Sequence, residues 1–326
     1  MGKSFRVLAI DGGGALGLYP AIILQQIEEH ILNGEPIQSH FDLITGTSTG
    51  GLIALSLSAG NSPEEIGQLY EERAKIIFPN NVLLPLRFIN CVIGRSIYSN
   101  KPLSAVLENH FGNMTMADLK IPVCIASVDT VTCTPIVFKT KNSEHLTRDL
   151  NYRLVDIAVA TSAAPVFFPT YGFETFESLI DGGVWQNNPS MIGLIEANAY
   201  FLRDGKSYDR VELLSIGNPL SNERSGYSRK CHFSSICSWN LKLVTLPMKV
   251  SSNGIHYQMK ILDQTNCMNL AKYLRIATDN RPKTKKRLAL NSSGRKALEI
   301  VRNQAFHDFN HFKNELISFF VREERV

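Results

Sequence analysis

The sequence predicts an α/β fold with a mostly parallel central sheet, followed by a mainly helical C-terminal region. Short apolar runs of strand length alternate with segments whose apolar residues recur at helical spacing, which is typical of strands connected by helices. Glycine-rich or polar turns separate these segments. With 326 residues, 44% of them hydrophobic, the chain is long enough to bury a large core.

The first elements follow one another at short intervals. Phe5 to Ile10 predicts a strand and Leu18 to Leu32 a helix with a polar outer face. Phe41 to Thr45 predicts a second strand, and Gly50 to Ala59 a second helix whose small apolar residues indicate burial. Ser62-Pro63 offers an N-cap followed by a first-turn proline, so a further helix is expected to begin there.

The alternation continues and then stops. Val123 to Asp129 and Pro135 to Phe138 predict strands, Leu154 to Thr161 a helix, and Val211 to Gly217 a late core strand. After Asn218-Pro219 the chain becomes polar and turn-rich, and then basic. We therefore expect an α/β domain over residues 1–220 and a helical, basic region over residues 221–326.

Bulk properties exclude several classes of protein. A formal net charge of +4 suits an anionic surface or ligand and argues against binding to DNA or RNA. The six cysteines form no CxxC pair and show no zinc spacing with histidine, so we expect free thiols and no metal. The first residues do not form a signal peptide, which predicts a cytoplasmic protein.

The segment Gly46-Thr47-Ser48-Thr49-Gly50 matches G-x-S-x-G between a predicted strand and a predicted helix. In that context a sharp turn presents the serine hydroxyl at the end of the strand, and the flanking glycines relieve crowding. The dipole of the following helix favours negative charge at its start. The segment therefore predicts a nucleophilic Ser48, although a turn rich in glycine, serine and threonine can also match by chance.

A second glycine-rich turn, Asp11-Gly12-Gly13-Gly14, joins the first strand to the first helix. Glycines let backbone N–H groups converge on one point, which suits an oxyanion. Together with Gly17 the same turn matches the G-x-G-x-x-G of dinucleotide-binding folds. Those folds have an acidic residue ending a second strand about 20 residues later. Here a helix and a turn occupy that stretch, so the dinucleotide interpretation is weak.

The base that would activate Ser48 is less obvious. A carboxylate beside two glycines, as in Asp181-Gly182-Gly183, can approach another backbone closely and accept the serine proton directly. Taken alone, Asp-Gly-Gly is also an ordinary turn signal. No histidine lies in a motif-like turn late in the predicted sheet. The eight candidates are His30, His40, His110, His145, His232, His256, His307 and His311.

Taken together, these motifs resemble those of the patatin-like phospholipase family. The match comprises Asp11 to Gly17 (DGGGALG), the Gly46–Gly50 turn, Ala160 to Pro169 (ATSAAPVFFP), and Asp181-Gly182-Gly183 followed by Asn187-Asn188-Pro189. The motifs occur in the family's order and roughly its spacing. The resemblance implies a patatin-like three-layer sandwich and an enzyme that hydrolyses lipid acyl esters.

The resemblance also implies roles for individual residues. Ser48 would attack the ester, Asp181 would act as general base, and backbone N–H groups of Gly12, Gly13 and Gly14 would hold the oxyanion. No metal or cofactor is required for that chemistry. One position departs from the family pattern, because Leu16 stands where a basic residue is common.

Ile76 to Gly94 is apolar and broken by prolines. Two interpretations are equally favoured: a lid or interfacial surface that admits a lipid tail to the serine, or a segment that covers the core.

Basic residues recur beyond residue 220, and most such runs are solvated faces. Tyr273, Arg275, Arg281 and Lys283 nevertheless combine an aromatic ring with cations, as binding of an anionic nucleotide or head group requires. The layout resembles phospholipase effectors of bacterial anti-phage defence. That resemblance implies activation by a cyclic di- or trinucleotide and a membrane phospholipid substrate at the inner face of the cell membrane. We also expect a homo-oligomer.

Two other functions stay open at this point. One is a soluble carboxylesterase with a Ser–His–Asp triad. The other is a non-catalytic nucleotide-binding module that keeps a patatin shell.

Overall fold

The computed structural model describes residues 3–79, 95–143, 145–202, 207–219, 242–277 and 288–320. In these residues one eight-stranded sheet forms the centre of the molecule, with strand order β5-β6-β3-β2-β1-β7-β8 and β4 paired with β3. The strands are β1 (Lys3–Ile10), β2 (Leu43–Thr47), β3 (Val123–Asp129), β4 (Thr134–Lys139), β5 (Tyr171–Phe173), β6 (Phe176–Asp181), β7 (Tyr208–Ile216) and β8 (Leu270–Ile276).

The five strands β3, β2, β1, β7 and β8 run parallel to one another. The remaining strands pair in antiparallel fashion beyond β3. The mostly parallel sheet predicted from the sequence is therefore confirmed. Because parallel strands end at the same edge of a sheet, the turns after β1 and β2 lie close together.

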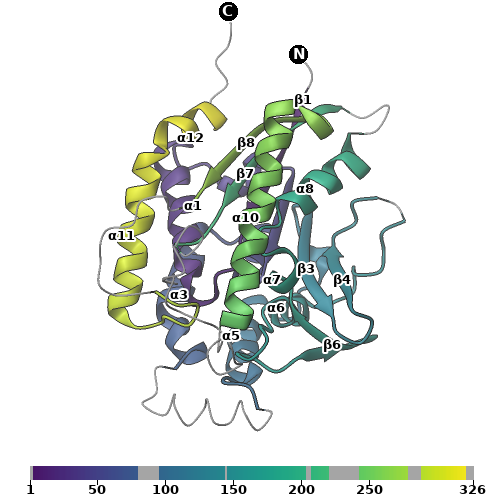
Figure 1. Ribbon diagram of the computed structural model, residues 1–326, viewed down its shortest axis with the longest axis vertical. Coiled ribbons are helices and arrows are strands. Elements are labelled where there is room, and N and C mark those ends of the chain that lie inside the picture. Colours follow the sequence, from purple (N-terminus) through teal and green to yellow (C-terminus); the bar gives the residue numbers. More distant parts are fainter. Residues whose placement is uncertain are drawn as a thin grey trace, which may run out of the picture.

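Helices cover both faces of the sheet, which makes the molecule a three-layer sandwich (Figure 1). One face is covered by α1, α2, α3, α5, α6, α11 and α12, and the other mainly by α8 and α10. The helices are α1 (Leu18–His30), α2 (Thr49–Ala59), α3 (Pro63–Ile77), α5 (Asn100–Phe111), α6 (Leu154–Thr161), α7 (Gly183–Gln186), α8 (Ser190–Glu196), α10 (Lys242–Thr265), α11 (Arg295–His311) and α12 (Lys313–Phe320).

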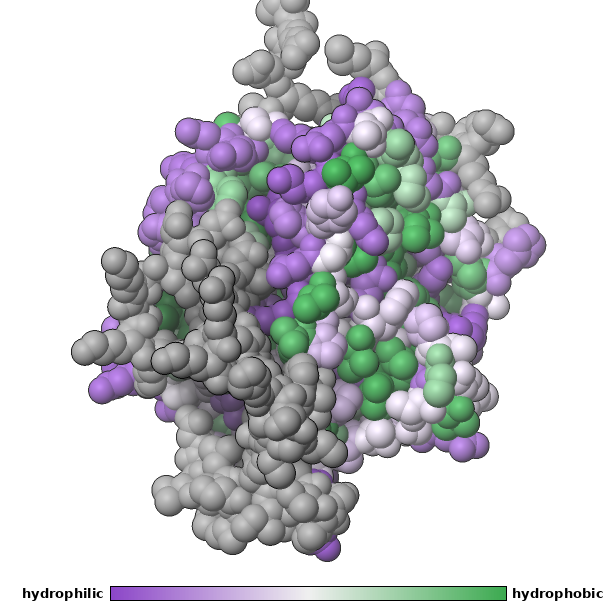
Figure 2. Space-filling model, viewed as in Figure 1, coloured by the Kyte–Doolittle hydropathy of each residue, from purple (hydrophilic) through white to green (hydrophobic). Residues whose placement is uncertain are grey.

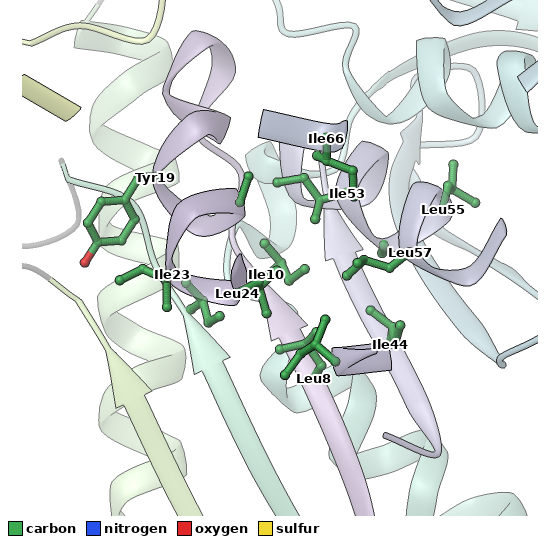
Figure 3. Close-up of a cluster of buried hydrophobic side chains, with 14 of the residues drawn as sticks. Leu8, Ile10, Tyr19, Ile23, Leu24, Ile44, Ile53, Leu55, Leu57 and Ile66 are labelled. Atoms are coloured by element: carbon green, nitrogen blue, oxygen red, sulfur yellow. The ribbon is translucent and has the colours of Figure 1, made fainter. Parts of the chain in front are cut away.

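Alternation along β1 shows why the sheet needs two covering layers. Leu8 and Ile10 point into the larger core with α1 and α2, as Figure 3 shows, whereas Val7 and Ala9 point into the smaller core with α8 and α10. All four side chains are fully buried. A central parallel strand must be apolar on both faces; Val7 to Ile10 meet this requirement, whereas Arg6 pairs with Glu212 on β7.

The described C-terminal residues belong to the same sandwich. β8 pairs with β7 along its whole length, and α11 lies beside α1 (Figure 1). Leu298 and Val301 of α11 share one core cluster with Leu8. The region expected to begin at residue 221 thus adds a strand and several helices to the first domain's sheet and core. We had not expected a strand there, because Lys272 and Arg275 interrupt the apolar pattern of β8.

Among the described residues, no helix is both long enough and apolar enough to cross a lipid bilayer.

Two helical glycines, Gly50 in α2 and Gly254 in α10, differ in the space around them. A Cβ on Gly50 would lie 2.1 Å from the carbonyl oxygen of Ile10, whereas a Cβ on Gly254, in the exposed part of α10, would meet nothing within 4 Å. Gly50→Ala should lower the free energy of unfolding by about 1–3 kcal/mol, because backbone must move. Gly254→Ala should raise it by roughly 0.5–1 kcal/mol, because alanine favours helix.

Denaturant unfolding of both variants measures this difference. Equal effects of the two substitutions would contradict the claim that backbones approach closely at Gly50.

Candidate active site

Ser48 occupies the sharp turn between β2 and α2. Its backbone has φ 54° and ψ −127°, a conformation that is strained for any residue other than glycine. A Cβ on Gly46 would lie 2.3 Å from the carbonyl oxygen of Gly50, so the turn can close only with glycine at that position. The predicted G-x-S-x-G turn therefore has the expected geometry, with the serine at its apex.

A hydrogen bond from a distant segment supports this turn. The Ser48 N–H donates to Thr161 Oγ1 at 2.9 Å, and the Thr161 hydroxyl donates to the Ala126 carbonyl on β3 at 2.6 Å. Thr161 ends α6 and belongs to the ATSAAPVFFP segment. Sequence reasoning quoted this segment as a family motif but assigned Thr161 no role, because a buried threonine gives no signal of its partner.

Strand register brings Asp181 to the same place. Thr47 on β2 pairs with Ala126 on β3, and the next residue of β3, Ser127, pairs with Asp181 at the end of β6. The Ser48 hydroxyl donates a hydrogen bond of 2.6 Å to Asp181 Oδ2. The two side chains that the sequence predicted to meet are thus in direct contact, although 133 residues separate them.

The two glycines after Asp181 hold its carboxylate in place. The Gly183 N–H donates to Asp181 Oδ1 at 2.7 Å, which leaves Oδ2 for the serine. A Cβ on Gly182 would lie 2.4 Å from the Ala126 carbonyl oxygen. The Asp-Gly-Gly sequence is therefore a support for the carboxylate as well as a turn.

Burial sets the proton affinity of this pair. Ser48 is 5% exposed and Asp181 is 1% exposed. Burial raises the pKa of Asp181 to about 6, against the opposing effect of the hydrogen bonds from Ser48 and the Gly183 N–H. The carboxylate is therefore ionised at neutral pH, yet it is more basic than an exposed aspartate, which suits a general base.

No histidine that the structure describes lines the cavity beside Ser48. A Ser–His contact does exist, between Ser56 Oγ on α2 and His110 Nε2 at 2.9 Å, but neither residue lines that cavity. In the described part of the chain, the partner of Ser48 is a carboxylate and not an imidazole.

The glycine turn after β1 lies against the serine, since a Cβ on Gly12 would be 3.1 Å from Ser48 Cβ. One expectation needs correction, because the Gly12 N–H donates to the Asn187 carbonyl at 3.1 Å and is not available to an oxyanion in this structure. No hydrogen bond engages the N–H groups of Gly13 and Gly14 within the described residues. These two are the remaining donors of the predicted set.

Leu16, the departure from the family pattern, is fully buried in the larger core. Its side chain therefore does not point toward Ser48, and apolar packing accounts for leucine at this position. The site has no side-chain cation at this point of the glycine turn.

A narrow apolar cavity of about 50 Å³ adjoins Ser48 and Asp181. Ile77 and Phe78, from the apolar Ile76 to Gly94 segment, form part of its walls. Residues 80–94 of that segment lie outside the described residues. Other walls come from distant elements: Leu52, Tyr70, Leu103, Ala164, Phe167, Phe168, Met248 and Leu290. The apolar lining suits a hydrocarbon chain, although the cavity volume is small for a whole acyl chain.

Of the residues expected to bind a nucleotide, Tyr273 and Arg275 lie on β8, and Arg281 and Lys283 lie outside the described residues. Arg275 forms an ion pair with Asp11. Within the described ranges no group of three or more histidine, cysteine, aspartate or glutamate side chains is placed to hold a metal ion.

Comparison with known proteins agrees with this geometry. The family model of patatin-like phospholipases matches residues 8–193, a range that contains the glycine turn, Ser48 and Asp181. The chain belongs to the patatin-like phospholipase family. Members of this family are lipid acyl hydrolases, so the chain is an enzyme of that class.

Several relatives carry the name cGAMP-activated phospholipase. The one from Escherichia coli is 35% identical over 276 residues, covering 78% of this chain and 74% of the relative. The one from Vibrio cholerae is 37% identical over 226 residues, covering 65% of this chain and 63% of the relative. Human GIVD cytosolic phospholipase A2 aligns in structure over 97% of this chain and 60% of that chain, with a TM-score of 0.47 and 10% identity.

The raised pKa of Asp181 predicts how activity depends on pH. If Asp181 must be ionised to accept the serine proton, kcat/KM should fall about tenfold per pH unit below about pH 6 and level off above it. Initial rates on a short-chain ester between about pH 4.5 and 8 measure this profile. A plateau extending down to about pH 4.5 would exclude Asp181 as the base.

The same pKa predicts an effect on stability. The folded-state pKa of Asp181 is higher than its ordinary value, so wild-type stability falls as pH rises through the interval between the two. Asp181→Asn removes this ionisation. The difference in free energy of unfolding, Asp181→Asn minus wild type, should be about 1–3 kcal/mol larger near pH 7.5 than near pH 4.

Urea unfolding of both proteins at the two pH values measures the difference. A stability change that is independent of pH would show that Asp181 titrates alike in the folded and unfolded chain.

Proposed function

We propose that this protein hydrolyses acyl esters of glycerophospholipids with Ser48 as nucleophile and Asp181 as its sole base, and that a cyclic nucleotide activates it. The observation that carries the proposal is the buried 2.6 Å hydrogen bond from Ser48 Oγ to Asp181 Oδ2. The carboxylate needs no relay, because it already accepts the proton that must leave the serine.

The geometry supports a two-step reaction. Asp181 takes the proton as Ser48 Oγ attacks the carbonyl carbon, and the N–H groups of Gly13 and Gly14 stabilise the negative oxygen. The intermediate collapses to an acyl-serine, and the leaving alcohol takes the proton from Asp181. Water then attacks the acyl-serine and gives a proton to Asp181, after which Ser48 is reprotonated and the fatty acid leaves.

Two features support a lipid substrate. The cavity at Ser48 is lined by apolar side chains such as Phe167 and Phe168. Exposed apolar side chains also lie close to the site, because α7 directly follows Asp181-Gly182 and carries Val184 and Trp185, while α10 carries Val250. Figure 2 shows apolar patches among polar groups on the face that α10 crosses. Trp and aliphatic groups at a surface favour contact with a membrane.

The proposed activation rests on the names of the relatives and on the small volume of the cavity. Both relatives named above are called cGAMP-activated phospholipases. The cavity of about 50 Å³ must widen before an acyl chain can reach Ser48, so a ligand that favours the wider form would raise activity. We extend the proposal to a role in anti-phage defence, in the cytoplasm at the inner face of the membrane. The expected homo-oligomer stays a prediction.

Substitution of the two side chains tests the chemistry. Ser48→Ala and Asp181→Asn should each lower phospholipid hydrolysis at least about 10³-fold while circular dichroism stays unchanged. Ser56→Ala and His110→Ala are matched controls, because they remove a buried serine and the imidazole that it contacts away from the cavity, and both should retain activity. Activity that survives Asp181→Asn but is lost with His110→Ala would support the carboxylesterase triad instead.

A nucleotide panel tests the activation. Hydrolysis of phosphatidylglycerol vesicles by the wild type should rise at least about tenfold with one cyclic di- or trinucleotide. A fluorophosphonate probe should label Ser48 faster in the same samples. A full rate without nucleotide, unchanged by any panel member, would overturn the activation; absence of labelling under every condition would support a non-catalytic module.

A further inference from the structure

A polar cavity of about 270 Å³ lies between α10, β8 and the residue after α11. It shares no lining residue with the cavity beside Ser48. The mechanism above uses none of its side chains. Those that matter here are His256, Lys260, Asp263, Tyr273, Arg275 and Phe312.

The lining suits a phosphorylated nucleoside. Lys260 is exposed on α10 and makes no hydrogen bond or ion pair with any described residue, so its ammonium can pair with a phosphate. Phe312, which packs partly against the larger core, also lines the cavity, where a base can stack on its ring. Asp263 Oδ1 accepts the Tyr273 N–H at 2.8 Å, and its other oxygen, Oδ2, can accept a base N–H group. The volume is slightly below the ~300–1,000 Å³ of typical ligand pockets, which fits one nucleotide of a cyclic oligonucleotide.

One wall of this cavity is tied to the glycine turn. Arg275 donates to Asp11 Oδ1 at 2.7 Å and to Asp11 Oδ2 at 2.6 Å, a bidentate pair whose side chains are 6% and 0% exposed. Asp11 directly precedes Gly12. Burial would lower the pKa of Arg275, but the Asp11 carboxylate outweighs burial and the pKa is raised. The cavity wall therefore fixes the first residue of the turn that holds the oxyanion.

Helix α10 makes a second connection. The Ser252 hydroxyl donates to Asp11 Oδ2 at 2.7 Å, and the Ser251 hydroxyl accepts from the Asn187 N–H at 3.3 Å. Asn187 in turn accepts the Gly12 N–H, the hydrogen bond that withholds this donor from an oxyanion. His256 and Lys260 follow one and two turns later on the same helix. A shift of α10 or of Arg275 would thus change the hydrogen bonds of the glycine turn.

We propose that this cavity binds one phosphorylated nucleoside unit of the activating nucleotide, and that Arg275 and Ser252 transmit its occupancy to the glycine turn. The inference rests on the activation proposed above and gives it a site. Lys260 and Phe312 contact the ligand, whereas Arg275 is a positioning residue that acts through Asp11.

Binding of cGAMP to the full chain, measured by calorimetry, tests the site. Lys260→Glu and Phe312→Ala should each raise Kd at least about tenfold and leave the basal hydrolysis rate unchanged. Lys101→Glu makes the same charge change on α5, which has no residue in this cavity, and should bind like the wild type.

The outcomes separate the two proposals. If the wild type is activated but Lys260→Glu and Phe312→Ala bind as tightly as Lys101→Glu, the cavity is not the site and the activation stands. If the wild type neither binds nor responds to cGAMP or any other panel member, the proposed activation falls and the inference falls with it. Binding of phosphatidylglycerol vesicles that depends on Lys260, without nucleotide binding, would assign the cavity to a lipid head group and overturn the inference.

Arg275→Lys tests the transmission, because lysine keeps the charge but cannot form the bidentate pair. We expect cGAMP to bind within about threefold of the wild-type Kd, with kcat lowered at least about tenfold, KM unchanged, and nucleotide-dependent fluorophosphonate labelling of Ser48 lost. Ser252→Ala is a milder variant that carries the same test if Arg275→Lys does not fold. Activation equal to that of the wild type in the folded variants would overturn the coupling.

Discussion

The close approach of backbone segments at the carboxyl edge of the sheet is the constraint on which the rest of the site depends. Gly50 lies against the carbonyl of Ile10, Gly182 against that of Ala126, and Gly46 against Gly50 itself. Each contact leaves no room for a side chain. The backbone conformation of Ser48 costs about 1–3 kcal/mol of strain. Ser48 keeps this conformation because the surrounding backbone leaves no room for another.

The two carboxylates at this edge, Asp181 and Asp11, are buried, and both are paired. Asp181 is held by Gly183, and Asp11 by Arg275 and Ser252. Removing one member of a buried ion pair typically destabilises a protein by about 3–5 kcal/mol, since the other charge remains without compensation. This edge of the sheet is therefore stabilised by residues from both ends of the sequence.

Sequence reasoning predicted the strands and helices that carry strong local patterns. The apolar run of β1, the N-cap of α3 and the glycine turns around Ser48 all signal their conformation within a few residues. Contact between Ser48 and Asp181 could be inferred only through a family resemblance, since register between non-adjacent strands leaves no local trace. The pairing of Arg275 with Asp11 also gives no local signal in the sequence. Because Arg275 is charged, the pattern of β8 did not predict a strand. The hydrogen bond that engages the Gly12 N–H depends on a carbonyl 175 residues away and could not be foreseen.

The contribution of late residues to the walls around Ser48 has a consequence for how such a chain can be divided. Met248 and Leu290 line the cavity beside the serine, and the Leu290 carbonyl accepts the Ala15 N–H next to the glycine turn. A shortened protein that kept every recognisable motif, and ended soon after β7, would expose the glycine turn on one side and remove both partners of the Asp11 carboxylate, Arg275 and Ser252. The residues that carry the family motifs therefore do not form the complete site by themselves. The region after residue 221 contributes walls of the cavity beside Ser48, although we expected it only to regulate the enzyme.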